Sequence, residues 1–172
     1  MSQLEHLWAG WRQAYVKGET SPQSLVETPE GLSIFSAIEQ SGLPDEETLI
    51  IHRGETCFVL LNVYPYTTGH SMVIPFREVE NLSDLTSQEY EELWQLVRTT
   101  VQSLEEAYNP DGVNVGLNQG QAAGAGIPEH LHVHCLPRWL GDTNFSTTVA
   151  GVRVLPETVK DTWTRLRKAW NK

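Results

Sequence analysis

Apolar residues recur every three or four positions between Ser87 and Tyr108, in the longest run of this kind in the chain. This spacing gathers them on one face of an amphipathic helix, so it predicts a helix over residues 87–108. Shorter runs with the same spacing predict a helix over residues 4–17, a helical turn over residues 33–38 and a terminal helix over residues 155–170.

Strands are predicted where apolar residues alternate with polar ones or form short unbroken runs. These segments are residues 48–52, 56–63, 71–74, 113–118 and 130–135. Only Arg53-Gly54-Glu55 separates the first two, which predicts a hairpin. We expect a meander of antiparallel strands with helices interposed and appended, which is the α+β class. With no internal repeat, residues 1–172 are predicted to form one domain, with about residues 1–32 as a helical extension and residues 155–172 as a C-terminal helix.

Composition narrows the function classes. A chain of 172 residues with 40% hydrophobic residues and six Trp can bury a real core. Its formal charge of −10 argues against binding to DNA or RNA backbone. The two cysteines, Cys57 and Cys135, lie in apolar runs without CxxC spacing, so we expect free thiols in a reducing cytoplasm. We find neither a stretch of transmembrane length nor a signal peptide, and expect no membrane partner.

Three of the six histidines, His130, His132 and His134, stand at alternating positions of the last predicted strand. Successive side chains of a strand point to opposite faces, so the three imidazoles are expected on one surface, ~7 Å from one to the next. The intervening residues are apolar and are expected to face the core. A merely polar strand is the least favoured interpretation, because unmatched buried imidazoles are costly.

Neutral imidazole is a good nucleophile toward phosphorus when one ring nitrogen donates to a carbonyl and the other keeps its lone pair. One ring of the three is expected to attack while its neighbours bind the phosphate oxygens or assist the departing oxygen. Residues 122–127, a run of Ala and Gly ending in Ile127, precede the histidines. Such small residues let backbone N–H groups approach phosphate, although a loose turn between strands is the structural alternative.

Metal binding is the competing hypothesis, since histidines at i and i+2 of one strand also hold zinc, iron or manganese. His70 is the one distant candidate ligand, and Glu129 is expected on the opposite face. The phosphorus chemistry is favoured because no further carboxylate joins the set.

The motif His130-x-His132-x-His134 resembles the signature of the histidine triad superfamily of nucleotide hydrolases and transferases. The likeness extends over about residues 33–157, through Asn62-x-Tyr64-Pro65-Tyr66-x-x-Gly69-His70, residues 118–127 and the segment that begins Pro137-Arg138-Trp139. This longer set resembles the branch that contains bacterial diadenosine tetraphosphate phosphorylases (ATP adenylyltransferases) and related dinucleoside polyphosphate hydrolases.

The resemblance implies a five-stranded antiparallel sheet with helices, paired in a homodimer. It also implies that His132 takes the nucleotidyl group as a covalent intermediate, that His134 contacts the transferred phosphate and helps the leaving group, and that His130 and His70 orient the nucleophile. The substrate-binding residues that it implies are Asn62 for the ribose, Ile34, Phe35, Ile38 and Leu60 around the base, Asn118, Gly126 and Ile127 for the phosphate, and Trp139, which stacks near a base or packs the dimer. Without the resemblance, we would predict that Ile34, Phe35 and Ile38 belong to the hydrophobic core.

Two departures from the family's pattern stand out. Many relatives carry Cys-x-x-Cys where this chain has Ser33-Ile34-Phe35-Ser36, and a His where it has Glu78; those residues are ligands of a structural zinc. All three are absent, so we expect no structural zinc, and packing around Phe35 must hold the segment unaided. The loop at Gly124-Ala125-Gly126 also differs from some phosphorylases, which leaves phosphate and water open as acceptors.

We therefore predict a cytoplasmic homodimeric enzyme that cleaves adenine dinucleoside polyphosphates through a nucleotidyl-His132 intermediate. It needs no cofactor beyond a divalent cation that the substrate polyphosphate itself can carry, and binds neither nucleic acid nor membrane. The alternatives are a hydrolase of nucleoside monophosphate conjugates such as phosphoramidates, and a non-catalytic nucleotide-binding sensor.

Overall fold

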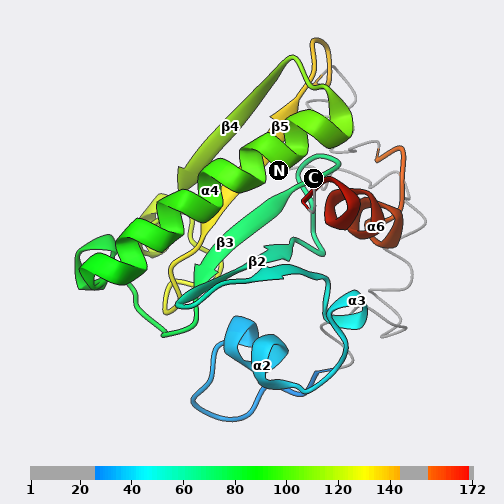
Figure 1. Cartoon of the computed structure of the whole chain (residues 1–172). Helices are drawn as coiled ribbons and strands as arrows, with labels where there is room; N and C mark the ends of the chain where they lie inside the picture. Colours follow the sequence, from blue (N-terminus) through cyan, green and yellow to red (C-terminus); the bar gives the residue numbers. More distant parts are fainter. Residues whose placement is uncertain (1–25, 144–154, 171–172) are drawn as a thin grey trace, which may run out of the picture.

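A five-stranded antiparallel sheet lies at the centre of the computed structural model, which describes residues 26–143 and 155–170 (Figure 1). The predicted helix over residues 4–17 lies outside these ranges. The strands are β1 (Ile50–Arg53), β2 (Cys57–Leu61), β3 (Ser71–Pro75), β4 (Gly112–Leu117) and β5 (Val133–Arg138). Their order is β1-β2-β3-β5-β4, and the predicted hairpin is confirmed as β1–β2. The simple meander is wrong, because the long connection after β4 lets β5 return between β3 and β4.

Helix α4 (Ser87–Tyr108) packs across one face of the sheet and has the bounds that the sequence predicts (Figure 1). Both ends are defined by local chemistry. Thr86 and Glu89 form a reciprocal capping box at the start, and Asn109 ends the helix in the left-handed conformation, with φ of 44°. Two 3₁₀ turns, η2 (Leu82–Asp84) and η3 (Gln121–Ala123), lie in the connections before α4 and after β4.

The two faces of the sheet carry different residues, because directly opposed residues of antiparallel strands share a face. Leu61, Ser71 and Cys135 stand opposite one another, and so do Leu60, Met72 and His134 on the other face. Cys57, four residues before Leu61 and on its face, donates its thiol to the Glu89 carbonyl of α4. His134 therefore lies on the face away from α4.

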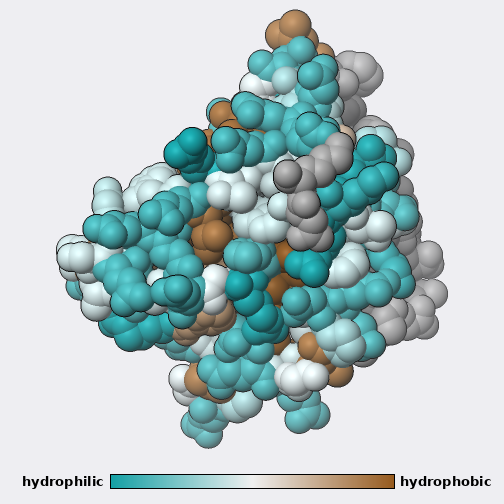
Figure 2. All heavy atoms as spheres, viewed as in Figure 1, coloured by the Kyte–Doolittle hydropathy of each residue, from teal (hydrophilic) through white to brown (hydrophobic). Residues whose placement is uncertain are grey.

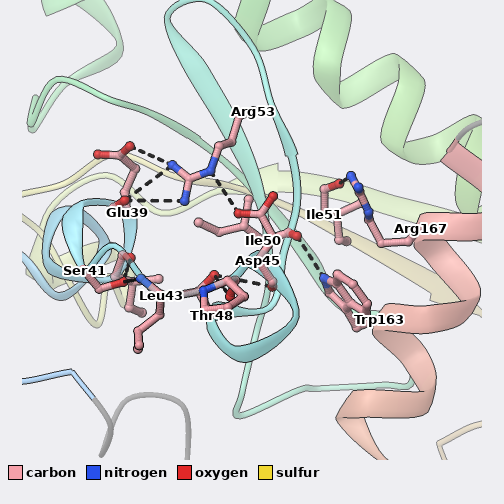
Figure 3. Close-up of polar contacts among 12 residues, drawn as sticks. Glu39, Ser41, Leu43, Asp45, Thr48, Ile50, Ile51, Arg53, Trp163 and Arg167 are labelled. Atoms are coloured by element: carbon pink, nitrogen blue, oxygen red, sulfur yellow. Dashed lines mark hydrogen bonds and ion pairs between the residues drawn. The ribbon is translucent and has the colours of Figure 1, made fainter.

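Helix α6 (Val159–Trp170) covers the β1 edge of the sheet and begins four residues later than predicted. Trp163 Nε1 donates to the Ile50 carbonyl at 2.9 Å, and the Arg167 guanidinium donates to the Ile51 carbonyl at 2.6 Å (Figure 3). These bonds satisfy carbonyls that an edge strand would otherwise expose.

Helices α2 (Ile34–Gln40) and α3 (Asp45–Thr48) precede the sheet. The Arg53 guanidinium joins both to β1 through Glu39 at 2.7 Å and Asp45 at 3.0 Å (Figure 3). The predicted helical turn is confirmed as α2. The predicted strand start at Thr48 is wrong, since Pro44 and the acidic residues 45–47 favour a helical turn there.

The predicted histidine strand is shifted toward the C-terminus: β5 begins at Val133 and ends at Arg138, so His130 and His132 precede it. Val133 pairs with Val73 of β3. Alternate residues of a strand point their backbone groups toward the same neighbour, so the next β3 residue that could bond toward β5 is Pro75, which has no N–H. The Pro75 carbonyl bonds the His130 ring instead, at 2.8 Å from Nε2.

The core combines both sheet faces with the helices and includes the two cysteines, which are free thiols as predicted. Burial raises the pKa of Cys57 to about 11 and the pKa of Cys135 to about 12. Figure 2 shows mostly hydrophilic residues on the visible surface, with small apolar patches between them. Among the described helices, none is long and apolar enough to cross a membrane.

Candidate active site

Four imidazoles gather on the sheet face away from α4. His70 immediately precedes β3, His134 belongs to β5, and their ring centroids are 5.0 Å apart. The ring of His132 is 4.8 Å from that of His134, and His130 is joined to His132 through its carbonyl. All four side chains are buried, with 8% exposure or less. The structure thus brings together the four histidines that the sequence singles out.

His132 presents a free nitrogen lone pair. Its Nδ1 lies 2.8 Å from the His130 carbonyl. A carbonyl can only accept, so Nδ1 carries the hydrogen and Nε2 keeps its lone pair. No described residue forms a hydrogen bond with that Nε2. Burial lowers the pKa of His132, so the ring is neutral near pH 7.

The His70–His134 pair has the opposite tautomer arrangement. The Tyr66 backbone N–H donates to His70 Nδ1 at 3.1 Å, so neutral His70 carries its hydrogen on Nε2. That Nε2–H donates to His134 Nδ1 at 2.9 Å, which leaves the His134 hydrogen on its own Nε2. Burial, followed by the neighbouring His132, lowers the pKa of His134 to about 4. His134 is therefore a neutral hydrogen-bond donor.

His130 is fixed through both ring nitrogens. Nε2 donates to the Pro75 carbonyl at 2.8 Å, so Nδ1 is the acceptor and receives the Ser33 hydroxyl at 2.6 Å. Burial lowers the pKa of His130 and keeps it neutral. The ring is fully buried, which fits a supporting role behind His132.

Helix α2 contacts the histidines through Phe35. The Phe35 ring meets those of His130 and His132 edge-on, with centroids 5.6 and 5.0 Å away. Phe35, Ile38 and Leu60 are buried in the core, while Ile34 is only partly buried. Leu60 shares the sheet face of His134.

Asn62 lies directly after β2, beside His70. Its Oδ1 accepts the Tyr64 N–H at 2.8 Å, and its Nδ2 lies 3.4 Å from His70 Nδ1. The structure therefore holds this predicted ribose ligand next to the histidines.

The loop before the histidines turns toward them at its end. The Ile127 carbonyl accepts the His130 N–H at 3.3 Å, and the Ile127 side chain packs against the core. Gly126 is exposed, and Asn118, just after β4, is partly buried. The predicted phosphate-binding segment thus ends at the triad.

Trp139 packs edge-on against Tyr108 of α4, with ring centroids 6.1 Å apart. This contact within the chain tests neither of the two roles considered for Trp139. Both rings line a cavity of about 970 Å³ together with Tyr66, Leu136 and Arg138. The Tyr66 ring lies 4.6 Å from that of His70, so the cavity adjoins the histidines.

The sequence analysis missed a polar cluster under α2. The Ser33 N–H donates to Glu78 Oε1 at 2.8 Å, and the Ser33 hydroxyl binds His130. Burial tends to raise the pKa of Glu78, but hydrogen bonds from Ser36 and Ser33 outweigh it and lower that pKa. The expectation that packing around Phe35 holds this segment unaided is wrong. The signal was present, because the three residues that replace zinc ligands can all hydrogen-bond.

Metal ligation is not apparent at the histidines. In residues 26–143 and 155–170, no group of three or more His, Cys, Asp or Glu side chains is arranged to hold a metal ion. The metal hypothesis stays untested, and a metal assay on the purified protein decides it.

Comparison with known proteins agrees with this fold. Residues 44–139 match the family model described as the HIT domain. The chain is 39% identical over 168 residues to the AP-4-A phosphorylase of Mycobacterium tuberculosis (strain H37Rv), covering 98% of this chain and 85% of that protein. It is 37% identical over 89 residues to the bis(5'-adenosyl)-triphosphatase of Dictyostelium discoideum, covering 52% of this chain and 59% of that protein.

The solved structure of a zinc-bound histidine triad family protein from Mycobacterium smegmatis superposes with a TM-score of 0.65 at 26% identity, covering 80% of this chain and 92% of that chain. The chain belongs to the HIT domain family, as its histidine motif predicts.

Proposed function

We propose that this protein is an enzyme that cleaves adenine dinucleoside polyphosphates, such as diadenosine tetraphosphate, through a nucleotidyl-His132 intermediate. The observation that carries the proposal is the tautomer of His132, whose Nδ1–H is held by the His130 carbonyl while Nε2 keeps its lone pair. The names of the M. tuberculosis and D. discoideum relatives support the substrate class.

In the first step, His132 Nε2 attacks the α-phosphorus, and the bond from phosphorus to the bridging oxygen breaks. The ring becomes a cation whose Nδ1–H stays on the His130 carbonyl, and the polyphosphate leaves as an anion. The His134 Nε2–H donates a hydrogen bond to the phosphate oxygens as charge develops on them. In the second step, phosphate or water attacks the same phosphorus, and the P–N bond breaks to restore neutral His132 with its Nδ1–H. When water is the acceptor, its proton is released to solvent.

The state of His134 favours a polyphosphate over an amine as the leaving group. A neutral imidazole with pKa lowered to about 4 donates a hydrogen bond well but gives up its remaining proton poorly. A departing nucleoside polyphosphate is stable as an anion, whereas the amine of a phosphoramidate needs a proton. This difference supports dinucleoside polyphosphates over phosphoramidates.

We propose that the substrate residues implied by the family keep their roles here. The ribose binds Asn62, and the base lies beside α2 and Leu60. Asn118 and the backbone N–H groups of Gly126 and Ile127 approach the phosphates. We also infer that the chain forms one domain and works in a reducing cytoplasm, which the two buried free thiols support.

Product analysis tests the proposed activity. The protein is incubated with diadenosine tetraphosphate, with and without inorganic phosphate, and the products are separated by chromatography. Phosphorolysis gives ADP and ATP, and hydrolysis gives AMP and ATP, so the products also identify the acceptor. The His132→Asn protein, purified in the same way, controls for contaminating enzymes. Nucleotide binding without turnover would support the sensor alternative.

We propose that the protein is a homodimer joined through β4. This strand is the sheet edge opposite β1, and no described residue outside β5 hydrogen-bonds its backbone. Val115 is 42% exposed on it. An uncovered edge strand invites pairing with a second copy. Light scattering at micromolar concentration should give the dimer mass, and a monomer mass would rule the proposal out.

We propose that no structural zinc binds between α2 and Glu78. Two hydroxyls and a carboxylate are a poor ligand set for zinc compared with thiolates and imidazole. Hydrogen bonds to Ser33 and Ser36 already engage Glu78. Elemental analysis of protein purified without chelators should find no stoichiometric zinc, and one zinc per chain would contradict this expectation.

The rate should stay high below the ordinary pKa of histidine. Burial lowers the pKa of His132 from 6.5, so the neutral nucleophile persists below that pH, and kcat/KM should fall only as the pH drops through the lowered pKa. In the unfolded chain His132 takes up a proton near pH 6.5, whereas in the folded chain it does so only at lower pH. The free energy of unfolding therefore also declines below pH 6.5. A kcat/KM profile whose acid limb lies above 6.5 would contradict the lowered pKa.

A further inference from the structure

A chain of hydrogen bonds leads from α2 to the proposed nucleophile. The Ser33 hydroxyl and His130 Nδ1 are 2.6 Å apart although 97 positions separate the two residues in the sequence. The His130 ring is bound on its other side by the Pro75 carbonyl, and the His130 carbonyl accepts the Nδ1–H of His132. His130 therefore connects Ser33 to the attacking ring of His132: its side chain binds Ser33, and its carbonyl binds His132.

The direction of the first bond follows from the others. His130 Nε2 faces a carbonyl and must donate, so in the neutral ring Nδ1 has only a lone pair. The Ser33 hydroxyl is consequently the donor. Each remaining polar group of Ser33 is occupied as well. Its N–H donates to Glu78 at 2.8 Å, and its Oγ accepts the Ser36 N–H at 3.2 Å as the N-cap of α2. The hydroxyl hydrogen has a second acceptor within reach, Ser36 Oγ at 3.4 Å, but His130 Nδ1 at 2.6 Å is the nearer one.

Burial makes this bond consequential. Ser33 is 3% exposed and His130 is fully buried, so bulk water does not replace a lost donor readily. A buried acceptor without a partner costs free energy, and the His130 ring would turn or shift to regain one. The carbonyl that fixes the His132 tautomer belongs to the same residue and would move with it.

Helix α2 also links this bond to the substrate side of the site. Phe35, two positions after Ser33, contacts the rings of His130 and His132. The proposed base-binding wall and the hydrogen bond to His130 therefore both belong to the start of one helix. Movement of that helix start would disturb both together.

We propose that Ser33, anchored by Glu78, is a positioning residue that fixes the orientation and tautomer of the nucleophile His132 through His130. The proposal rests on the proposed function, in which His132 is the nucleophile. It gives the polar cluster under α2 a role in turnover in addition to its role in holding the helix.

Three variants of the full chain test the proposal. Ser33→Ala removes the hydroxyl but keeps the N–H to Glu78. Ser33→Thr keeps the hydroxyl. Thr86→Ala is the matched control, because it also removes a helix N-cap hydroxyl, that of α4, without touching the histidines. With diadenosine tetraphosphate, Ser33→Ala should lower kcat by roughly 10- to 100-fold with little change in KM, the size of loss seen when a group that orients a metal-binding imidazole is removed. Ser33→Thr should restore most of kcat, and Thr86→Ala should keep all of it.

Nitrogen NMR of protein labelled with ¹⁵N-histidine gives a readout that does not need turnover. The wild-type spectrum should show His130 as the Nε2–H tautomer and His132 as the Nδ1–H tautomer, and Ser33→Ala should lower the Nδ1–H population of His132. Full kcat in Ser33→Ala, an equal loss in Thr86→Ala, or a loss with an unchanged His132 tautomer would each overturn the proposal. A wild-type protein without turnover would instead contradict the proposed function, and the tautomer measurement would still decide the role of Ser33.

Discussion

Replacing His132 with Asn should abolish turnover of diadenosine tetraphosphate by several orders of magnitude. Loss of a nucleophile removes the covalent pathway itself, and no other described side chain offers a comparable nitrogen at this position. His134 Nδ1 is occupied by His70, and both ring nitrogens of His130 are bound. Nucleotide binding should be nearly unchanged, because Asn62 and α2 remain. Steady-state kinetics and equilibrium binding of a nucleotide measure the two effects separately.

The control for this variant is His52→Asn. This substitution also removes an imidazole, but one outside the triad. His52 lies in β1 and its ring stacks on Trp170, with centroids 4.9 Å apart. It should retain wild-type turnover. If folded His132→Asn keeps a tenth or more of wild-type turnover, the covalent mechanism is wrong and the metal hypothesis returns.

Signals from residues close in sequence predicted the helices and strands whose ends are set by their own residues. The bounds of α4 follow from apolar periodicity, the capping pair Thr86 and Glu89, and Asn109 at its end. The alternation of His132 and His134 likewise predicted that their rings share a face. These features depend on contacts between residues close in sequence, so one sequence is enough to find them.

Contacts between distant residues were not predictable in the same way. The return of β5 between β3 and β4 depends on which edges pair, and periodicity does not encode this choice. The early end of the β3–β5 ladder depends on Pro75 facing the segment before Val133. The link from Ser33 to His130 likewise joins two parts of the chain that meet only in the folded protein.

The partial success at the site has the same explanation. Spacing identified which imidazoles share the site, but tautomers depend on partners from other segments. His70 carries its hydrogen on Nε2 because the Tyr66 N–H occupies Nδ1, and His132 carries its hydrogen on Nδ1 because the His130 carbonyl lies there. The roles of the rings therefore become distinguishable only in three dimensions.

These tautomers make His134→Asn the variant that separates the two central histidines. His134 donates from Nε2 and forms no bond to phosphorus, so its loss should slow turnover by ~10²–10⁴-fold without removing the pathway. The adenylylated protein should still form, slowly, in a single-turnover mixture with diadenosine tetraphosphate, and mass spectrometry of the quenched protein detects it. His132→Asn should form none under the same conditions. If His134→Asn forms no adduct while His132→Asn does, His134 is the nucleophile, and the tautomer assigned to the His70–His134 pair is then wrong, because an Nε2 that carries the hydrogen has no lone pair for the attack.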